Sequence, residues 1–135
     1  GLGYTVAILA EISKAVVGVE VDPILAQKAS SVMVELGIDN VLIVEKELVS
    51  GYSKQAPYDV IIFDGAIEQV PRDIMKQLVD GGRLVSVFYE ESNSLGSLGK
   101  VVVQTKFGDV VSKIERFDAS APILLDFKKE RYFKF

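Results

Sequence analysis

The stretch GLGYTVAILAEISKAVVGVE, residues 1–20, decides the fold predicted for this chain. Gly1 and Gly3 open it, and the apolar residues that follow have the i, i+3, i+4 spacing of a helix with one buried face. A β-branched run at residues 15–19 then ends at Glu20, as is typical of a strand buried on both faces. Glycines, a helix and a buried strand ending in a carboxylate together predict a nucleoside-binding α/β unit.

Predicted helices and strands continue to alternate after this stretch. Their expected positions are a helix opened by Asp22 and Pro23 and closed by Gly37, strands at 41–44 and 58–63, a helix at 71–79 and a strand at 84–89. Parallel neighbouring strands need crossover connections, so the alternation predicts a parallel sheet with helices on its faces. Two further strand-like runs, at 101–105 and 110–114, have only a Gly-containing turn between them, which predicts a terminal antiparallel hairpin.

Composition narrows the chemistry. The length of 135 residues predicts one domain, and the net charge of −4 argues against general binding to a nucleic-acid backbone. The chain contains no His and no Cys, which excludes Cys/His zinc sites, thiol nucleophiles and Ser-His-Asp triads. No apolar run reaches the roughly 18 residues of a membrane span. We therefore expect a soluble, cytoplasmic protein without a metal, nucleic-acid or membrane partner.

The predicted ligand site centres on the glycines and Glu20. Glycine lets the main chain approach a ligand closely, and the carboxylate of Glu20 can accept both hydroxyls of a ribose. Val6 stands where a dinucleotide pattern requires a third glycine, and no Lys-Ser/Thr pair follows as in a P-loop. An adenosyl ligand without a diphosphate fits best, and S-adenosylmethionine is the common one. The alternative is a tight turn beside a solvated Glu20.

Several segments resemble the protein-L-isoaspartate O-methyltransferase family, and the resemblance spans nearly the whole chain. They are residues 3–10, 16–20, 39–41, 56–61 and 77–84, with 65–71 and the segment from Phe117 onward similar to a divergent bacterial branch. The resemblance implies a Rossmann-like class I methyltransferase sheet that ends in an antiparallel hairpin. It also implies S-adenosyl-L-methionine as cofactor and methyl transfer to isoaspartyl carboxylates of damaged proteins or peptides, which is a protein-repair role.

The resemblance also implies which residues form the site. Some of these residues lie where this sequence departs from the family pattern. Around the cofactor it implies Gly1, Gly3, Tyr4, Glu20, Val21, Glu47, Leu48 and Asp64, and on the substrate side Gly65 and Ala66. Residues 46–48 replace the family's usual Gly-Asp-Gly, and residues 64–68 replace a run of small residues, adding two carboxylates. Asp64 has a second reading as a cap of the next turn, and we expect Glu68 to be an ordinary exposed carboxylate. No catalytic side chain is assigned, because an ionised carboxylate attacking a sulfonium methyl needs alignment and exclusion of water.

The family's first strand, which leads into the glycines, would lie in the middle of the sheet, and this sequence begins after it. Five buried apolar side chains there would contribute roughly 10 kcal/mol, against about 5–15 kcal/mol for a whole domain. We therefore expect residues 1–135 to be one methyltransferase domain that is N-terminally incomplete and inactive alone. Residues 64–68, the acceptor loop, depart from the family pattern on the expected substrate side, so a non-catalytic binding module of the same fold is the alternative function. A continuous parallel sheet in place of the hairpin would favour a nicotinamide-binding oxidoreductase.

Overall fold

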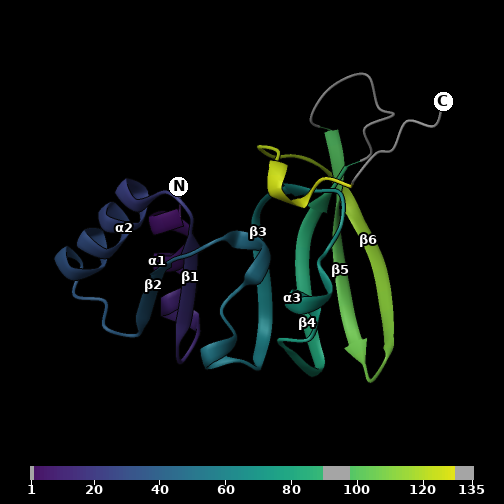
Figure 1. The fold of residues 1–135 in the computed structure, drawn as a ribbon, viewed down its shortest axis with the longest axis horizontal. Coiled ribbons are helices and arrows are strands. Elements are labelled where there is room, and N and C mark those ends of the chain that lie inside the picture. The colour runs from purple at the N-terminus through teal and green to yellow at the C-terminus, as the bar shows by residue number, and fades with distance from the viewer. Residues whose placement is uncertain (1, 90–97, 130–135) are drawn as a thin grey trace. The chain divides into compact units, whose positions relative to one another are not determined.

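A computed structural model of the chain describes residues 2–89 and 98–129. The chain forms two compact units, Gly1–Lys54 and Gln55–Phe135 (Figure 1). The described strands form two sheets, a two-stranded sheet β1-β2 in the first unit and a four-stranded sheet β3-β4-β5-β6 in the second. None of the helices in the described residues has the length and apolar character needed to cross a membrane.

The first unit alternates helices and strands as predicted. Its elements are α1 (Leu2–Ile12), β1 (Val16–Glu20), α2 (Pro23–Glu35), β2 (Val41–Glu45) and the short 3-10 helices η1 (Leu48–Ser50) and η2 (Ser53–Gln55), the last of which reaches the boundary of the second unit. The two strands pair in parallel, with Val16 opposite Val41 and Glu20 opposite Glu45. This register brings the carboxyl ends of both strands to the same edge.

The boundaries of α2 follow from three residues. The Asp22 carboxylate accepts hydrogen bonds from the backbone N–H groups of Ile24 (2.8 Å) and Leu25 (3.2 Å), and Pro23 occupies the first helical position. Gly37 follows the helix with a φ of +67°, a left-handed conformation that costs a residue with a Cβ considerably more than it costs glycine. The predicted start and end of this helix are confirmed.

Helix α1 begins earlier than the sequence predicted, because Leu2 and Gly3 are already helical. Its buried side includes Val6, which is 2% exposed, and Ala10. At its far end the Asn40 side-chain amide donates hydrogen bonds to the carbonyls of Ala10 (2.8 Å) and Ser13 (3.0 Å). These carbonyls lie where a helix leaves acceptors without intrahelical partners, so Asn40 fixes the turn between α1 and β1.

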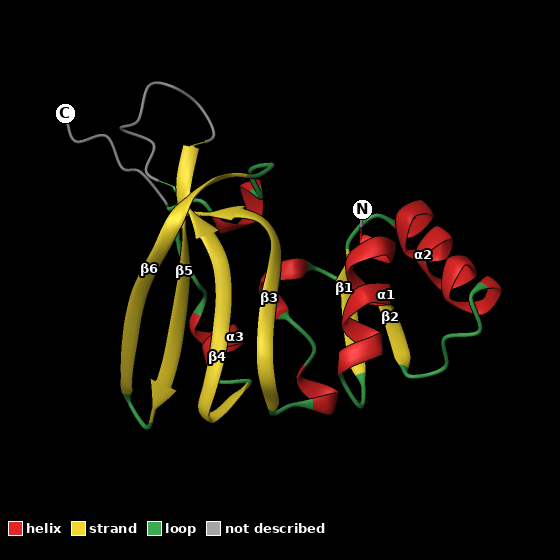
Figure 2. Cartoon of the chain, turned by 180° about the vertical axis from the view of Figure 1, so that it is seen from behind, coloured by secondary structure: helices red, strands yellow, loops and turns green. Residues whose placement is uncertain are grey.

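The second unit is a mixed sheet with little helix. Its elements are β3 (Tyr58–Ile67), α3 (Arg72–Met75), β4 (Leu78–Phe88), β5 (Leu98–Phe107), β6 (Val110–Ser120) and η3 (Leu125–Phe127). Strands β3 and β4 are parallel, whereas β4, β5 and β6 run antiparallel to one another, so the predicted terminal hairpin is confirmed (Figure 2). The helix predicted over residues 71–79 is wrong in extent, because Leu78 already pairs with Tyr58 and belongs to the sheet.

The two faces of this sheet differ in burial. Leu84 on β4 is fully buried, and its cross-strand partner Gln104 is 3% exposed. Lys106 lies two residues beyond Gln104 and donates hydrogen bonds to the carbonyls of Met75 (3.3 Å) and Leu78 (3.0 Å), so α3 lies over this face. On the opposite face the register aligns one apolar side chain from each strand, namely Ile62, Val85, Val103 and Ile114. The outer two remain well exposed, with exposed fractions of 42% for Ile62 and 47% for Ile114.

Each sheet also has an open edge in the described part of the chain. Strand β1 pairs only with β2, and β3 pairs only with β4 apart from a single parallel bridge between Ala66 and Ile123. An edge strand presents unpaired N–H and C=O groups that can accept another strand.

Candidate functional site

The first unit gathers its predicted cofactor residues at one end. Helix α1 has 11 residues, or about 16 Å at 1.5 Å per residue, and β1 has 5 residues, or about 17 Å. A short turn reverses the chain between them, so the start of α1 and the carboxyl end of β1 lie at the same end of the unit (Figure 2). Ligands bind at the carboxyl ends of parallel strands in open α/β folds.

Glu20 is held in place at this end by hydrogen bonds on both sides. Its backbone carbonyl accepts from the N–H of Lys46 (3.0 Å), which ties β1 to the residue after β2. Its Oε1 accepts from the N–H of Asp22 (3.1 Å), which fixes the carboxylate beside the turn into α2. The side chain is half-buried, and Val21 beside it is 49% exposed.

Glu47 and Leu48 arrive at the same end because β2 runs parallel to β1. Glu47 is exposed at the N-terminal boundary of η1 and makes no capping hydrogen bond with its side chain. Tyr4, in the first turn of α1, is 76% exposed. The structure therefore brings six of the predicted cofactor residues to one end of this unit, namely Gly3, Tyr4, Glu20, Val21, Glu47 and Leu48. Gly1 lies outside the described residues.

Gly3 differs from its predicted setting. It lies within the first turn of α1 rather than in a loop, and a Cβ built on it would be 3.5 Å from the Cα of Ala29 on α2. The glycine thus lies at the contact between the two helices, a packing role that the sequence pattern did not indicate.

Asp64, Gly65 and Ala66 belong to the second unit. Strand β3 does not end at Phe63 as predicted but continues to Ile67 after an irregularity. Ile62 pairs with Val85 and Ala66 pairs with Val87, so the three residues 63–65 lie opposite Ser86 alone. Such bulges change the direction in which side chains point and are frequent beside active sites. Asp64 is exposed in this bulge, whereas Ala66 is fully buried.

The expectation that Glu68 is an ordinary exposed carboxylate is wrong. Glu68 is 6% exposed, and its Oε2 accepts a hydrogen bond from the backbone N–H of Lys129 (2.9 Å). The sequence offered no local signal for this burial, because the covering residues come from the chain end, about sixty positions later.

A C-terminal segment, residues 122–129, covers the loop that was predicted to face the substrate. The N–H of Ala66 donates to the carbonyl of Pro122 (2.7 Å), and the carbonyl of Ala66 accepts from the N–H of Leu124 (2.8 Å). A Cβ on Gly65 would lie 2.6 Å from Leu124 Cγ and 2.8 Å from Pro122 O, so only glycine permits this approach. The apolar run at residues 122–125 was the available sequence signal.

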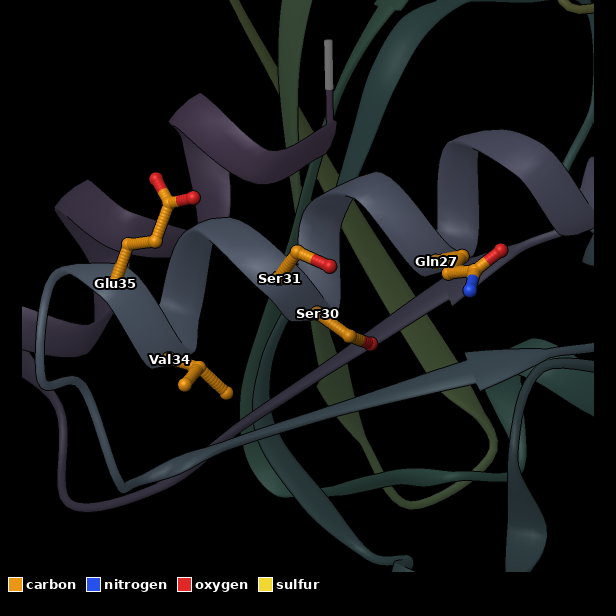
Figure 3. A pocket seen from close by; sticks show the side chains of 5 residues that line it. All are labelled: Gln27, Ser30, Ser31, Val34 and Glu35. Carbon is orange, nitrogen blue, oxygen red and sulfur yellow. The ribbon is translucent and has the colours of Figure 1, made fainter.

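One hollow on the described surface lies away from the predicted site residues. A hollow on the outer side of α2 is formed by that helix alone and contains none of the predicted site residues (Figure 3); it is lined by Gln27, Ser30, Ser31, Val34 and Glu35. Within residues 2–89 and 98–129, no group of three acidic side chains is placed to hold a metal ion. A hydrogen bond to Asp118 raises the pKa of Lys100, but this pair lies on the exposed hairpin.

Comparison with solved structures defines the fold class. A protein-L-isoaspartate O-methyltransferase superposes with a TM-score of 0.73 at 24% identity, covering 82% of this chain and 34% of that protein. A candidate protein-L-isoaspartate O-methyltransferase from Plasmodium falciparum, solved with S-adenosyl-L-homocysteine, gives 0.65 at 19% identity, covering 82% of this chain and 52% of that one. The chain has the Rossmann-like fold of class I methyltransferases. A nicotinamide-binding oxidoreductase would have been favoured by a continuous parallel sheet, and the sheet ends in an antiparallel hairpin instead.

Sequence comparison identifies the family. The model of the protein-L-isoaspartate(D-aspartate) O-methyltransferase family matches residues 1–114, so the chain belongs to this family. Protein-L-isoaspartate O-methyltransferase 2 of Archaeoglobus fulgidus is 39% identical over 88 residues, which is 63% of this chain and 40% of that protein. The protein-L-isoaspartate O-methyltransferase of Picosynechococcus is 41% identical over 85 residues, covering 63% of this chain and 38% of that protein. This chain thus matches about two fifths of the length of these relatives.

Proposed function

We propose that the protein is an S-adenosyl-L-methionine-dependent protein-L-isoaspartate O-methyltransferase. Membership of that family supports the proposal, and the position of Glu20 is the structural observation on which it chiefly rests. A half-buried carboxylate, fixed by the Asp22 N–H at the carboxyl end of a parallel strand, is suited to accept the hydroxyls of a ribose. Gly3, Tyr4, Val21, Glu47 and Leu48 would surround the adenosyl group from the same end of the first unit.

The proposed reaction makes modest demands on side chains. The isoaspartyl carboxylate of a damaged protein or peptide is ionised at neutral pH and attacks the sulfonium methyl, forming the carbon–oxygen bond as the carbon–sulfur bond breaks. The leaving group is a neutral thioether, so no proton has to be transferred. The protein contributes alignment of the two reactants and exclusion of water, which is compatible with a chain that lacks His and Cys.

We further propose that residues 1–135 form one methyltransferase domain only together with an additional strand. Both β1 and β3 have an open edge in the described residues, and parallel strands are ordinarily paired and covered on both faces. A strand supplied from outside residues 1–135 would complete the sheet edge with which it paired. The proposal predicts that the 135-residue chain binds the cofactor more weakly than a version extended upstream. The cytoplasm is the proposed location, and cell fractionation tests it.

Calorimetric titration with S-adenosyl-L-methionine tests the cofactor site in the whole protein. Hydrogen bonds to a charged group are worth about 1.5–3 kcal/mol, so Glu20→Gln should weaken binding roughly 10- to 150-fold. Glu11→Gln, an exposed acid of α1, is the matched control and should bind as the wild type does. Equal affinities of the Glu20 and Glu11 variants would overturn the assignment of Glu20.

The covered acceptor loop favours one second candidate, a non-catalytic binding module of the same fold. Both backbone hydrogen-bonding groups of Ala66 are occupied by residues 122–124, which leaves them unavailable to a substrate peptide. Methyl transfer to an isoaspartyl peptide separates the two candidates. Turnover by the whole protein supports the enzyme, and cofactor binding without turnover supports the module.

A further inference from the structure

The C-terminal segment, residues 122–129, is attached to the loop at residues 65–69 along its whole length. At one end Ala66 forms the parallel bridge to Ile123 on the edge of β3 that faces away from β4. At the other end the N–H groups of Glu68 and Gln69 both donate to the carbonyl of Phe127 (3.2 Å each). Figure 1 shows the segment, in yellow, crossing from the end of β6 to the end of β3.

Side chains of the loop add two more attachments. The buried Glu68 carboxylate accepts from the N–H of Lys129 (2.9 Å), and the Gln69 side-chain amide donates to the carbonyl of Lys128 (3.1 Å). Between these attachments and the Ala66 bridge, Phe127 is 1% exposed and meets Phe63 edge-to-face at 4.8 Å between ring centroids. The loop thus binds the main chain of the segment and anchors one aromatic ring.

The family match does not account for this arrangement, because it ends at residue 114. Glu68 stands in the loop where this chain departs from the small residues expected of the family, and its carboxylate binds a segment that lies beyond the residues of the family match. Burying a carboxylate is costly unless hydrogen bonds compensate, and here the Lys129 N–H is one such bond.

We infer that Glu68 is a positioning residue, which holds residues 122–129 on the loop and thereby makes that segment the acceptor-side surface. The inference rests on the proposed methyltransferase function. Since the main chain at Ala66 is already hydrogen-bonded, a peptide acceptor meets the side chains of the covering segment instead. Ile123, 36% exposed, and Leu125, 69% exposed, are the large apolar side chains that this segment exposes. The surface therefore suits a peptide with an apolar residue near its isoaspartyl group.

Hydrogen exchange on the full chain tests the positioning role without requiring activity. In Glu68→Ala the amide of Leu124, which bonds Ala66, should exchange about tenfold faster, the effect of losing one hydrogen bond worth about 1.4 kcal/mol. Glu68→Gln keeps an oxygen acceptor and should restore the wild-type rate. Gln69→Ala alters an exposed side chain, so it should fold normally and still speed the exchange of Leu124. The amide of Val85 in the sheet should stay unchanged in all three variants.

Kinetics of the whole protein on isoaspartyl peptides tests whether residues 122–129 form the acceptor-side surface. Glu68→Ala should raise the KM of a peptide with a neighbouring Leu about tenfold, with affinity for S-adenosyl-L-methionine unchanged, and Glu68→Gln should behave as the wild type. Glu115→Gln, on the exposed face of β6, is the control. Unchanged exchange at Leu124, or equal acceleration at Leu124 and Val85, overturns the positioning role. Absence of turnover by the wild type overturns the proposed function instead, and the exchange result still stands.

Discussion

Phe127 is the single side chain whose removal should most weaken the second unit. Phe127 is 1% exposed, and its ring packs against the Phe63 ring in an edge-to-face arrangement with an interplanar angle of 85°. Phe-to-Ala changes at such sites remove the transfer free energy of the ring and leave a cavity, a loss of about 3–5 kcal/mol. Because whole domains are stable by only about 5–15 kcal/mol, Phe127→Ala should lower the urea midpoint severely.

Phe117→Ala is the matched control, since it deletes the same side chain from β6, where Phe117 is 64% exposed. A surface change of this kind should alter the free energy of unfolding by no more than about 0.5 kcal/mol. The chain has no Trp, so far-UV circular dichroism during urea titration is the suitable measurement. If the two variants lose equal stability, or Phe127→Ala loses less than about 1 kcal/mol, Phe127 is not the buried anchor of the C-terminal segment.

Two smaller perturbations test local features. Asp22→Ala removes the acceptor for two N–H groups at the start of α2 and should lower the free energy of unfolding by about 1 kcal/mol, whereas Asp22→Asn should retain most of it, as measured by urea titration. Asp118→Ala removes both the hydrogen-bond acceptor and the negative charge that raise the pKa of Lys100, so an NMR titration should show that pKa falling towards 10.5. A raised pKa stabilises the folded state at pH values below the unfolded pKa of 10.5, and this stabilisation is lost as the pH rises through the higher pKa of the folded state. The free energies of unfolding of wild type and variant should therefore begin to converge only as the pH rises above 10.5.

Local signals in the sequence predicted those parts of the fold that depend on neighbouring residues. Asp22, Pro23 and Gly37 define α2 because caps and terminators act within a few positions along the chain. The hairpin was equally readable, since Gly108 adopts a φ of +58° between two β-branched runs. The alternation of elements, with its parallel β1-β2 pairing, followed from the same local patterns.

Features created by distant contacts could not be predicted in this way. The helix expected over residues 71–79 stops at Met75, because Leu78 gains a partner in β3 about twenty positions earlier. Glu68 looks like a surface acid in its own context, and only the return of Phe127 and Lys129 buries it. The site divides similarly: the position of Glu20 followed from its strand, whereas the cover over Ala66 depends on the chain end.

The open edge of β3 affects how this protein must be handled at high concentration. Asp59 and Asp64 are both exposed and bracket the apolar run at residues 60–63. If two copies aligned these strands in parallel and in register, each carboxylate would meet its own duplicate, and the repulsion would oppose aggregation. Removing the charge of Asp64 to examine cofactor contact would therefore also remove one of these gatekeepers, so such a variant should be purified and assayed dilute.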